Sequence, residues 1–471
     1  MANSLDRLYQ ASPVWLQQSM VSVYGLWWRQ RRFSGQYSRL VREYRARERW
    51  SSDQFSAYQR DHLIRLLLQA RQSPYYRSIL DQLEFQSARS PEEVLPEIPL
   101  LSKEVLREQP QNLLTESQIP RRTLIFKSSG TTGTPTEIYY TPEFHALELA
   151  VPEARNLGWA GLSSRDRRVM FGVRKVCRYD QDRPPFWRFS PAENMAYASI
   201  YHLSPRYLPD YLRFLREYRP AIIMGYPSAL YTVARFAREH DDLPAPARGV
   251  FTTSETVTVE NRRVIEEAWQ CKIYDRYGAV EGCLFAAQCE FGRYHVSPEV
   301  GIIEILDPHG QPCAPGEMGE VICTGLQNAL QPLIRYRIGD VARWAVDQDC
   351  ACRRQMPILE AIEGRFEDLC LTPDGREMLR FDTVFKGVTD IREAQVVQKA
   401  VDHFVIHVVP SNGFNRDDVD QLTHNFRLHA GDVPVEIVPV SEIPRSPSGK
   451  FRAVICEIPE AEKRRILQGK N

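Results

Sequence analysis

The sequence predicts an α/β protein. A large N-terminal domain would contain mainly parallel sheets flanked by helices and a β-rich subdomain, and a small, mobile C-terminal α/β domain would follow. Strand-like apolar runs alternate with helix-like runs between residues 120 and 290, as in crossover units on a parallel sheet. The end of the chain repeats this alternation on a smaller scale. Because 471 residues exceed one ordinary core, we expect domains at 1–364 and 365–471.

The first hundred or so residues favour helices and form a helical extension of the large domain. Ser51 and Gln54 have the spacing of a capping box, which marks a helix start. Apolar residues then recur at helical spacing. Prolines between 91 and 99 interrupt the helices before the alternating region begins.

Strand-like and helix-like runs alternate in the central region, between residues 120 and 290. Its expected strands cover 123–126, 221–224, 249–252 and 272–274, and its expected helices cover 208–218 and 259–269. Between 301 and 344 short strands separated by Gly and Pro turns predict the β-rich subdomain. The small domain is expected to contain strands at 403–409 and 435–440, a helix at 415–429 and a hinge near 364–368.

Charge and cysteine usage bound the class of protein. Sixty basic residues balance sixty acidic ones, which removes the usual electrostatic reason to expect nucleic-acid binding. The first residues lack the pattern of a signal peptide, and ten cysteines are spread through a long chain. We therefore expect reduced thiols in a cytoplasmic enzyme.

The most apolar early stretch, 14–28, is too short and too often interrupted by polar residues to span a bilayer. Its basic continuation at 29–32 leaves a weak peripheral membrane contact open. The oligomeric state stays open as well.

The most informative segment is a loop rich in Gly and hydroxyl residues, Ser128-Ser129-Gly130-Thr131-Thr132-Gly133-Thr134-Pro135. Such a loop exposes consecutive backbone N–H groups and hydroxyls that can bind phosphate oxygens. It is not a Walker A loop, because no Gly-Lys-Ser/Thr closes it. Taken alone, a flexible turn is the alternative.

Four further segments follow in order: Tyr277-Gly278-Ala279-Val280-Glu281, Tyr336-Arg337-Ile338-Gly339-Asp340, Gly364-Arg365-Phe366-Glu367-Asp368 and Pro444-Arg445-Ser446-Pro447-Ser448-Gly449-Lys450. They offer an aromatic face with a carboxylate, an acid suited to ribose hydroxyls, a cation with two acids, and a lone lysine. Each segment alone is a weak signal. Their order and intervals make chance a poor explanation.

In sequence and order, these five segments resemble the core motifs of the acyl-adenylate-forming superfamily of acyl-CoA synthetases, peptide-synthetase adenylation domains and luciferases. The likeness is greatest to phenylacetate–coenzyme A ligases and to adenylate-forming proteins of capsule-biosynthesis clusters, and it spans about residues 40–457. The resemblance implies that ATP activates a carboxylic acid as an acyl-AMP, with release of pyrophosphate. Coenzyme A would then accept the acyl group.

The resemblance also implies individual roles in binding ATP and Mg²⁺. Ser129, Gly130, Thr131 and Thr132 would hold the phosphates, and Ser254, Glu255, Tyr277 and Gly278 would surround the adenine. Glu281 would coordinate Mg²⁺, Asp340 would bind the ribose and Arg365 would contact ribose or phosphate. Lys450 would bridge the carboxylate and the α-phosphate, so Lys450, Glu281 and Thr131 are the catalytic candidates, with the hinge at Glu367 and Asp368.

Two positions depart from the family pattern. Val280 stands where a hydroxyl residue is usual, which removes one phosphate contact, and Glu367 replaces the commoner aspartate. Lys450 and both loop threonines are retained, which argues against a non-catalytic nucleotide-binding homologue. That homologue stays an alternative.

The acyl pocket is expected to involve Phe171, Tyr201, Tyr226 and Ser228. Its aromatic residues suit an aryl or flat acyl group, although aromatic residues are also common core fillers. Transfer of the acyl group to a carrier-protein thiol or to an amine is the alternative to coenzyme A.

Cys289, His295, Cys350 and Cys352 could form a structural zinc site, because three thiolates and an imidazole suit that ion. Their spacing is not that of a standard zinc finger, and four reduced residues in loops are the alternative. The resemblance adds support, since similar Cys and His pairs occur in capsule-associated relatives. Cys283 is the nearest spare ligand candidate, and the other cysteines are expected to be ordinary core or surface residues: Cys177, Cys271, Cys313, Cys323, Cys370 and Cys456.

Overall fold

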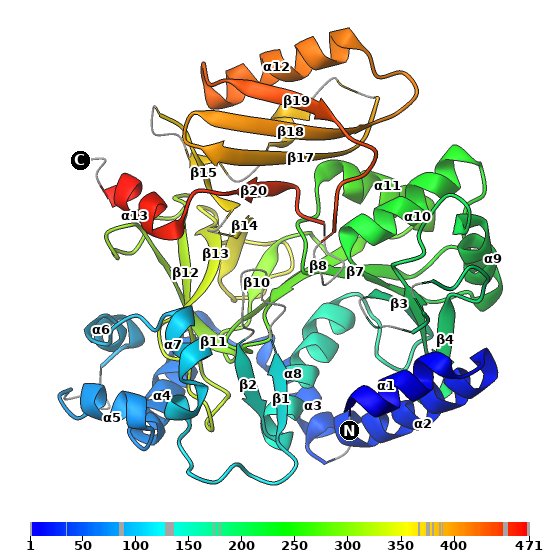
Figure 1. Ribbon diagram of the computed structural model, residues 1–471. Coiled ribbons are helices and arrows are strands. Elements are labelled where there is room, and N and C mark those ends of the chain that lie inside the picture. The colour runs from blue at the N-terminus through cyan, green and yellow to red at the C-terminus, as the bar shows by residue number, and fades with distance from the viewer. Residues whose placement is uncertain are drawn as a thin grey trace. The chain divides into compact units, whose positions relative to one another are not determined.

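The computed structural model describes residues 2–33, 35–83, 89–127, 136–172, 174, 176–178, 180–365, 368–373, 377–378, 381–385, 388, 390–445 and 451–468 (Figure 1). The chain divides into two compact units. Unit 1 comprises Met1–Ile303, Cys323–Tyr336 and Asp347–Leu359, and unit 2 comprises Glu304–Ile322, Arg337–Val346 and Glu360–Asn471. The domain boundary at 364/365 stays a prediction.

Unit 1 begins with helices, as the sequence predicted. They are α1 (Ala2–Ala11), α2 (Val14–Phe33), α3 (Tyr37–Arg47), α4 (Ser52–Ala70), α5 (Pro74–Leu80), α6 (Pro91–Val94), η1 (Leu95–Glu97), α7 (Lys103–Glu108) and η2 (Pro110–Leu113). The predicted capping box is present, since Ser51 Oγ accepts from Gln54 N and the Gln54 side chain accepts from Ser51 N. Two otherwise unpaired N–H groups of α4 are thereby satisfied.

The alternating region follows a two-stranded ribbon, β1 (Leu124–Lys127) and β2 (Glu137–Tyr140), and the helix α8 (Pro142–Val151) with its π-helical continuation η3 (Pro152–Leu157). Its elements are β3 (Arg168–Gly172), β4 (Trp187–Ser190), η4 (Pro191–Glu193), β5 (Met195–Ser199), α9 (Leu208–Tyr218), β6 (Ile222–Gly225), α10 (Pro227–Glu239), β7 (Gly249–Thr253), α11 (Val259–Trp269), β8 (Ile273–Gly278), β9 (Phe285–Gln288) and β10 (Tyr294–Val296).

The main sheet has the strand order β11-β12-β13-β14-β10-β9-β8-β7-β6-β3-β5-β4. Four of its strands follow β10 in the chain: β11 (Gly301–Leu306), β12 (Gly319–Gly325), β13 (Tyr336–Trp344) and β14 (Ile358–Arg365). Neighbours among β5, β3, β6, β7 and β8 pair in parallel, whereas β4, β9 and β10 run antiparallel to their neighbours. The predicted fold class is confirmed.

The crossover helices explain why this sheet forms. The apolar residues of α9, α10 and α11 pack with β3, β5, β6 and β7 into one buried cluster, in which Trp269, Tyr211 and Phe171 have almost no exposed surface. In Figure 1 α10 and α11 lie side by side next to these strands. Parallel strands require such helical crossovers, and their burial on both faces explains their continuous apolar runs.

Strand β4 is an edge strand of the main sheet, and helix α2 covers it. The side-chain amide of Gln18 donates to Phe189 O, and Gln18 Oε1 accepts from Phe189 N at 2.8 Å. One glutamine thus satisfies both backbone groups of an edge-strand residue, as a neighbouring strand would. Covering an edge in this way prevents it from pairing with another chain.

Unit 2 contains a separate four-stranded sheet of order β19-β18-β17-β20. Its elements are β15 (Cys370–Leu371), β16 (Glu377–Met378), η6 (Asp382–Phe385), β17 (Ile391–Ala400), β18 (His403–Pro410), α12 (Arg416–Ala430), β19 (Val435–Pro439), β20 (Val454–Cys456) and α13 (Glu460–Gln468). Phe404, Leu422 and Phe426 pack α12 onto this sheet. The predicted strands at 403–409 and 435–440 and the predicted helix at 415–429 are confirmed.

A buried ion pair crosses the core of unit 1. The guanidinium of Arg155, on η3, donates two hydrogen bonds of 2.6 and 2.9 Å to the carboxylate of Glu299, and neither side chain is exposed. The ring of Tyr44 lies 5.5 Å from the Arg155 guanidinium carbon. A charge left alone in such surroundings is costly, because the interior cannot solvate it.

We expect Glu299→Gln to destabilise unit 1 by about 3–5 kcal/mol, since it leaves Arg155 charged and buried. The fall in denaturation midpoint can be followed by tryptophan fluorescence. As a matched control, Glu260→Gln breaks the exposed pair with Arg263, which is worth about 0–1 kcal/mol. Equal midpoints for the two variants would contradict the assignment.

Candidate functional site

The candidate site lies at the carboxyl ends of the parallel strands in unit 1. Strands β5, β6, β7 and β8 end directly before segments that carry Tyr201, Tyr226, Glu255 and Glu281. Because the strands are parallel, these ends share one edge of the sheet. Ligands of open α/β sheets bind in the crevice outside that edge.

Four of the predicted residues form a group there. Glu255 Oε2 accepts a 3.0 Å hydrogen bond from Ser228 N in the first turn of α10, where the helix dipole favours a carboxylate. Burial, with the neighbouring Glu255 and Tyr201, raises the pKa of Tyr226 to about 12. The Tyr226 hydroxyl is therefore protonated near pH 7 and can donate a hydrogen bond. Ser254, beside Glu255, is exposed and has a left-handed backbone (φ +71°).

Glu281 is held in place by a tyrosine from a distant part of unit 1. The hydroxyl of Tyr336, a fully buried residue, donates to Glu281 Oε1 at 3.1 Å. Glu281 is 6 % exposed and keeps a second carboxylate oxygen. A carboxylate with one oxygen fixed by a neutral donor is suited to present the other to a hard cation such as Mg²⁺. The sequence placed Tyr336 in a motif but gave no sign of this role.

The turn that carries Glu281 is fixed from α8 and β2. Tyr140 OH donates to Val280 O at 2.7 Å. Gly282 has φ +61°, and a Cβ atom there would lie 2.5 Å from the ring of Phe144. Both the left-handed backbone and the close approach therefore require glycine. Tyr277 and Gly278 end β8 just before this turn, with Tyr277 largely buried and Gly278 exposed.

Two of the predicted residues of unit 2, Asp340 and Arg365, lie on strands. Asp340 is largely buried in β13 and follows Gly339, whose φ is +85°. Arg365 ends β14. Asp368 forms an ion pair with Arg452, so the hinge acid is bound to the segment before β20.

Several predictions fall outside the described residues: Ser129, Gly130, Thr131 and Thr132 of the phosphate loop, Glu367 of the hinge, and Lys450. Phe171, expected in the acyl pocket, is completely buried in the core at the end of β3. Its role in the pocket stays a prediction.

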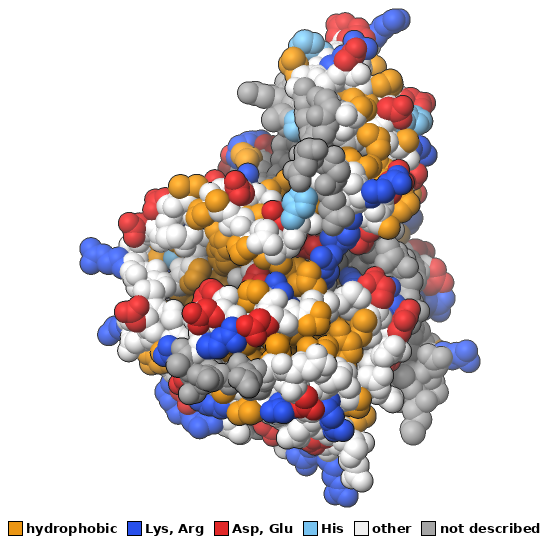
Figure 2. Space-filling model, turned by 90° about the vertical axis from the view of Figure 1, so that its left-hand side faces the viewer, with side chains coloured by type: hydrophobic (Ala, Val, Ile, Leu, Met, Phe, Trp, Pro, Cys, Tyr) orange, Lys and Arg blue, Asp and Glu red, His pale blue; other side chains and the backbone are white. Residues whose placement is uncertain are grey.

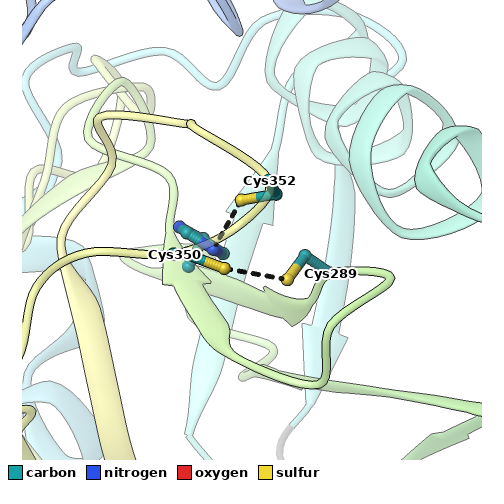
Figure 3. Close-up of side chains that lie close together, drawn as sticks. Cys289, Cys350 and Cys352 are labelled. Atoms are coloured by element: carbon teal, nitrogen blue, oxygen red, sulfur yellow. Dashed lines mark hydrogen bonds between the residues drawn. The ribbon is translucent and has the colours of Figure 1, made fainter.

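The structure brings the four predicted metal ligands of unit 1 together. Cys289 follows β9, His295 lies in β10, and Cys350 and Cys352 come from the loop before β14 (Figure 3). Their four ligand atoms all lie within 4.8 Å of one another. Cys289 Sγ lies 3.7 Å from Cys350 Sγ, and Cys352 Sγ lies 3.2 Å from His295 Nε2.

This donor set fits zinc. Two sulfurs on a tetrahedral Zn²⁺ with bonds of about 2.3 Å lie about 3.8 Å apart, close to the observed separation of the Cys289 and Cys350 sulfurs. His295 Nδ1 lies 3.3 Å from Met356 O, which leaves Nε2 to face the thiols. A hydrogen bond at the other ring nitrogen is the usual way to orient a metal-binding histidine.

Acidic and basic side chains are interspersed over the face in Figure 2. On α2 the apolar residues Trp15, Val23, Leu26 and Trp27 are exposed, between 47 and 69 %. Within the described parts of the chain, no helix could span a lipid bilayer. The peripheral membrane contact stays a prediction.

Comparison with known families identifies two parts of the chain. Residues 196–331 match the model of the AMP-binding enzyme family, and residues 371–457 match that of the CapK C-terminal domain. The first match runs from β5 to β12 and so contains the strand ends described above. The second covers the separate sheet of unit 2.

Curated relatives align over most of the chain. Protein CapK of Staphylococcus aureus is 23 % identical over 460 residues, covering 96 % of this chain and all of that protein. A phenylacetate-coenzyme A ligase of Thermus thermophilus is 25 % identical and covers 86 % of this chain and 96 % of its own length.

Solved structures agree on the fold. A 2-hydroxyisobutyryl-CoA ligase in the postadenylation state superposes with a TM-score of 0.67 at 20 % identity, covering 90 % of this chain and 93 % of that one. The predicted resemblance to the acyl-adenylate-forming superfamily is confirmed: the chain carries a domain of the AMP-binding enzyme family, and Protein CapK and phenylacetate-coenzyme A ligases are among its relatives.

Proposed function

We propose that this protein uses ATP to convert a carboxylic acid to an acyl-AMP, releases pyrophosphate, and transfers the acyl group to the thiol of coenzyme A. The observation that carries the proposal is the group at the carboxyl ends of the parallel strands, within a chain that aligns along most of its length with phenylacetate-coenzyme A ligases. The strand-end residues without the alignment to these relatives would support the proposal less strongly.

In the adenylation step a carboxylate oxygen of the acid attacks the α-phosphorus of ATP, and the bond to pyrophosphate breaks. Two anions must approach each other, so the site has to supply positive charge. Lys450 would contact the attacking carboxylate and the α-phosphate, and Ser129, Gly130, Thr131 and Thr132 would bind the phosphates. When bound, Mg²⁺ supplies further positive charge, and Glu281 would hold it.

The remaining nucleotide contacts follow the family pattern. Tyr277 and Gly278 would lie against the adenine with Ser254 and Glu255 beside it. Asp340 would accept hydrogen bonds from the ribose hydroxyls, and Arg365 would contact ribose or phosphate. The ordered Tyr336–Glu281 contact supports this arrangement, because a pre-oriented carboxylate costs little to reorganise during the reaction.

The acid is proposed to be aryl or similarly flat. Tyr201 and Tyr226 are half-buried neighbours whose rings offer apolar faces, and Tyr226, which also neighbours Glu255, has a protonated hydroxyl near pH 7. Phe171 would support this wall from the core. A panel of aryl and alkyl acids, screened for pyrophosphate release, tests the preference.

The acceptor has two candidates. Coenzyme A is favoured because two of the curated relatives are named phenylacetate-coenzyme A ligases. A carrier-protein thiol or an amine is the alternative, and mass spectrometry of the products with each acceptor separates them. A hinge at Glu367 and Asp368 would let one site serve both half-reactions. If no acid in the panel releases pyrophosphate, the protein is a nucleotide-binding homologue without turnover.

We also propose that Cys289, His295, Cys350 and Cys352 bind a structural Zn²⁺. Four protein ligands leave no open position, which is typical of structural rather than catalytic sites. The ion would fasten the loop at 350–352 to the β9–β10 hairpin.

Lys450→Ala is expected to lower the rate of ATP–pyrophosphate exchange by about 10²–10³, since one preorganised donor to the transition state is lost. Its circular dichroism should be unchanged. Lys399→Ala, which removes an exposed lysine of β17, is the matched control and should keep the parent rate. Near-parental exchange in Lys450→Ala would exclude this role for the lysine.

Tyr336→Phe is expected to raise the Mg²⁺ concentration for half-maximal exchange about fivefold, because Glu281 loses a hydrogen bond worth about 1 kcal/mol. The measurement is an Mg²⁺ titration at saturating ATP. Tyr76→Phe is the control, since that buried hydroxyl accepts from Ile334 N instead. The same Mg²⁺ dependence in both variants would remove Tyr336 from the site.

Elemental analysis of the purified protein is expected to find about one zinc ion per chain. Cys352→Ser should lose most of it and unfold at a lower temperature. Cys271→Ser alters a half-buried thiol of the same unit outside the cluster and should retain the metal. A parent protein without zinc, or equal zinc in both variants, would rule the site out.

A further inference from the structure

Two cysteines of unit 2 lie together, although no sequence motif pairs them. Cys370 is in β15 and is completely buried, and Cys456 ends β20 and is half-buried. Both side chains pack in the same hydrophobic cluster of unit 2, where each thiol shifts the pKa of the other. They are separated by more than eighty positions in the sequence, so only the fold brings them together.

Gln398 of β17 fixes the position of both cysteines. Cys456 is its partner in the parallel register of β17 and β20, and Cys456 Sγ lies 3.3 Å from Gln398 Oε1. On the other side, the Gln398 amide bonds to the backbone of Leu371, the neighbour of Cys370, where its Oε1 accepts from Leu371 N at 2.9 Å. The two strands are therefore held at a set distance through one side chain.

A buried cation distinguishes the two sulfurs. Lys463 of α13 has no exposed surface and contacts Cys456. A hydrogen bond from Cys370, together with the Lys463 charge, lowers the pKa of Cys456 to about 6 against the effect of burial. The same contact with Cys456 and the burial of its own side chain raise the pKa of Cys370. Cys456 is therefore the more acidic of the two thiols, and it is also the more exposed one.

We propose that Cys456 and Cys370 form a peroxide-oxidisable dithiol, in which Cys456 reacts first and Cys370 closes an intramolecular disulfide. The Cys456 thiolate attacks one peroxide oxygen, the O–O bond breaks, and hydroxide leaves and takes up a proton to give sulfenic acid and water. The Cys370 sulfur then attacks the Cys456 sulfur. The S–O bond breaks, and the thiol proton of Cys370 leaves with the hydroxide as a second water. Two thiols are oxidised and one hydrogen peroxide is reduced.

A disulfide between Cys370 and Cys456 would restrict the part of unit 2 next to the candidate hinge. Cys370 follows Asp368 of the candidate hinge, and its Sγ lies 3.6 Å from Asp368 O. Cys456 ends the strand that comes after the segment with Lys450. A covalent bond here would tie the start of β15 to β20. This chemistry does not depend on the proposed ligase activity, so its test does not measure turnover.

The test treats the full-length protein with hydrogen peroxide near pH 7, blocks the remaining thiols, and analyses the peptides without reduction. The expected product is a linked peptide pair containing Cys370 and Cys456, lighter by two hydrogen atoms than the two thiol peptides together and lost on reduction. In Cys370→Ser, Cys456 should instead accumulate as sulfenic acid that a cyclic 1,3-diketone traps.

Cys313→Ser is the matched control, because Cys313 is a half-buried thiol of the same unit. This variant should form the Cys370–Cys456 link at the parent rate. The proposal is overturned if other cysteines are oxidised while the link is absent, or if Cys370→Ser yields no trapped sulfenic acid at Cys456. Circular dichroism of each variant checks that it is folded.

Discussion

Backbone hydrogen bonding between the parallel strands β5, β3, β6, β7 and β8 is the constraint on which the candidate site depends. Parallel pairing places every carboxyl end at one edge, so Glu255 after β7 meets Ser228 after β6 although the two residues are 27 positions apart. The crossover helices hold this register by burying both faces of the strands. A shift of one residue in any strand would exchange the side chains of its two buried faces and disrupt the packing on both.

Side chains from other parts of unit 1 orient Glu281 and the turn that carries it. Tyr336 and Tyr140 belong to strands distant in sequence, yet their hydroxyls fix the Glu281 carboxylate and the preceding carbonyl. Each hydrogen bond contributes only about 1 kcal/mol. Their value lies in geometry, because a carboxylate that is already oriented needs no reorganisation when a cation or substrate arrives. Gly282 completes the arrangement, since the turn has no room for a Cβ atom.

The chemistry expected of each cysteine depends on the side chains around it. All ten are free thiols, but Cys289, Cys350 and Cys352 face an imidazole, whereas Cys456 faces a buried ammonium and a second thiol. Others, such as Cys323, are fully buried in apolar strands. A donor set of three sulfurs and a nitrogen favours a metal, and a thiolate next to a thiol favours disulfide chemistry.

The sequence by itself determined the fold class, the resemblance to the superfamily and several of the helices and strands, because periodicity and motif order are local properties that can be read from a single chain. The helix at Leu208–Tyr218 and the capping box at Ser51 are examples. Only the tertiary structure decided that Tyr336 holds Glu281, that Glu255 caps α10, and that Cys370 meets Cys456. Those contacts join residues tens to more than eighty positions apart, and their partners are selected by strand register and burial, which no local pattern encodes.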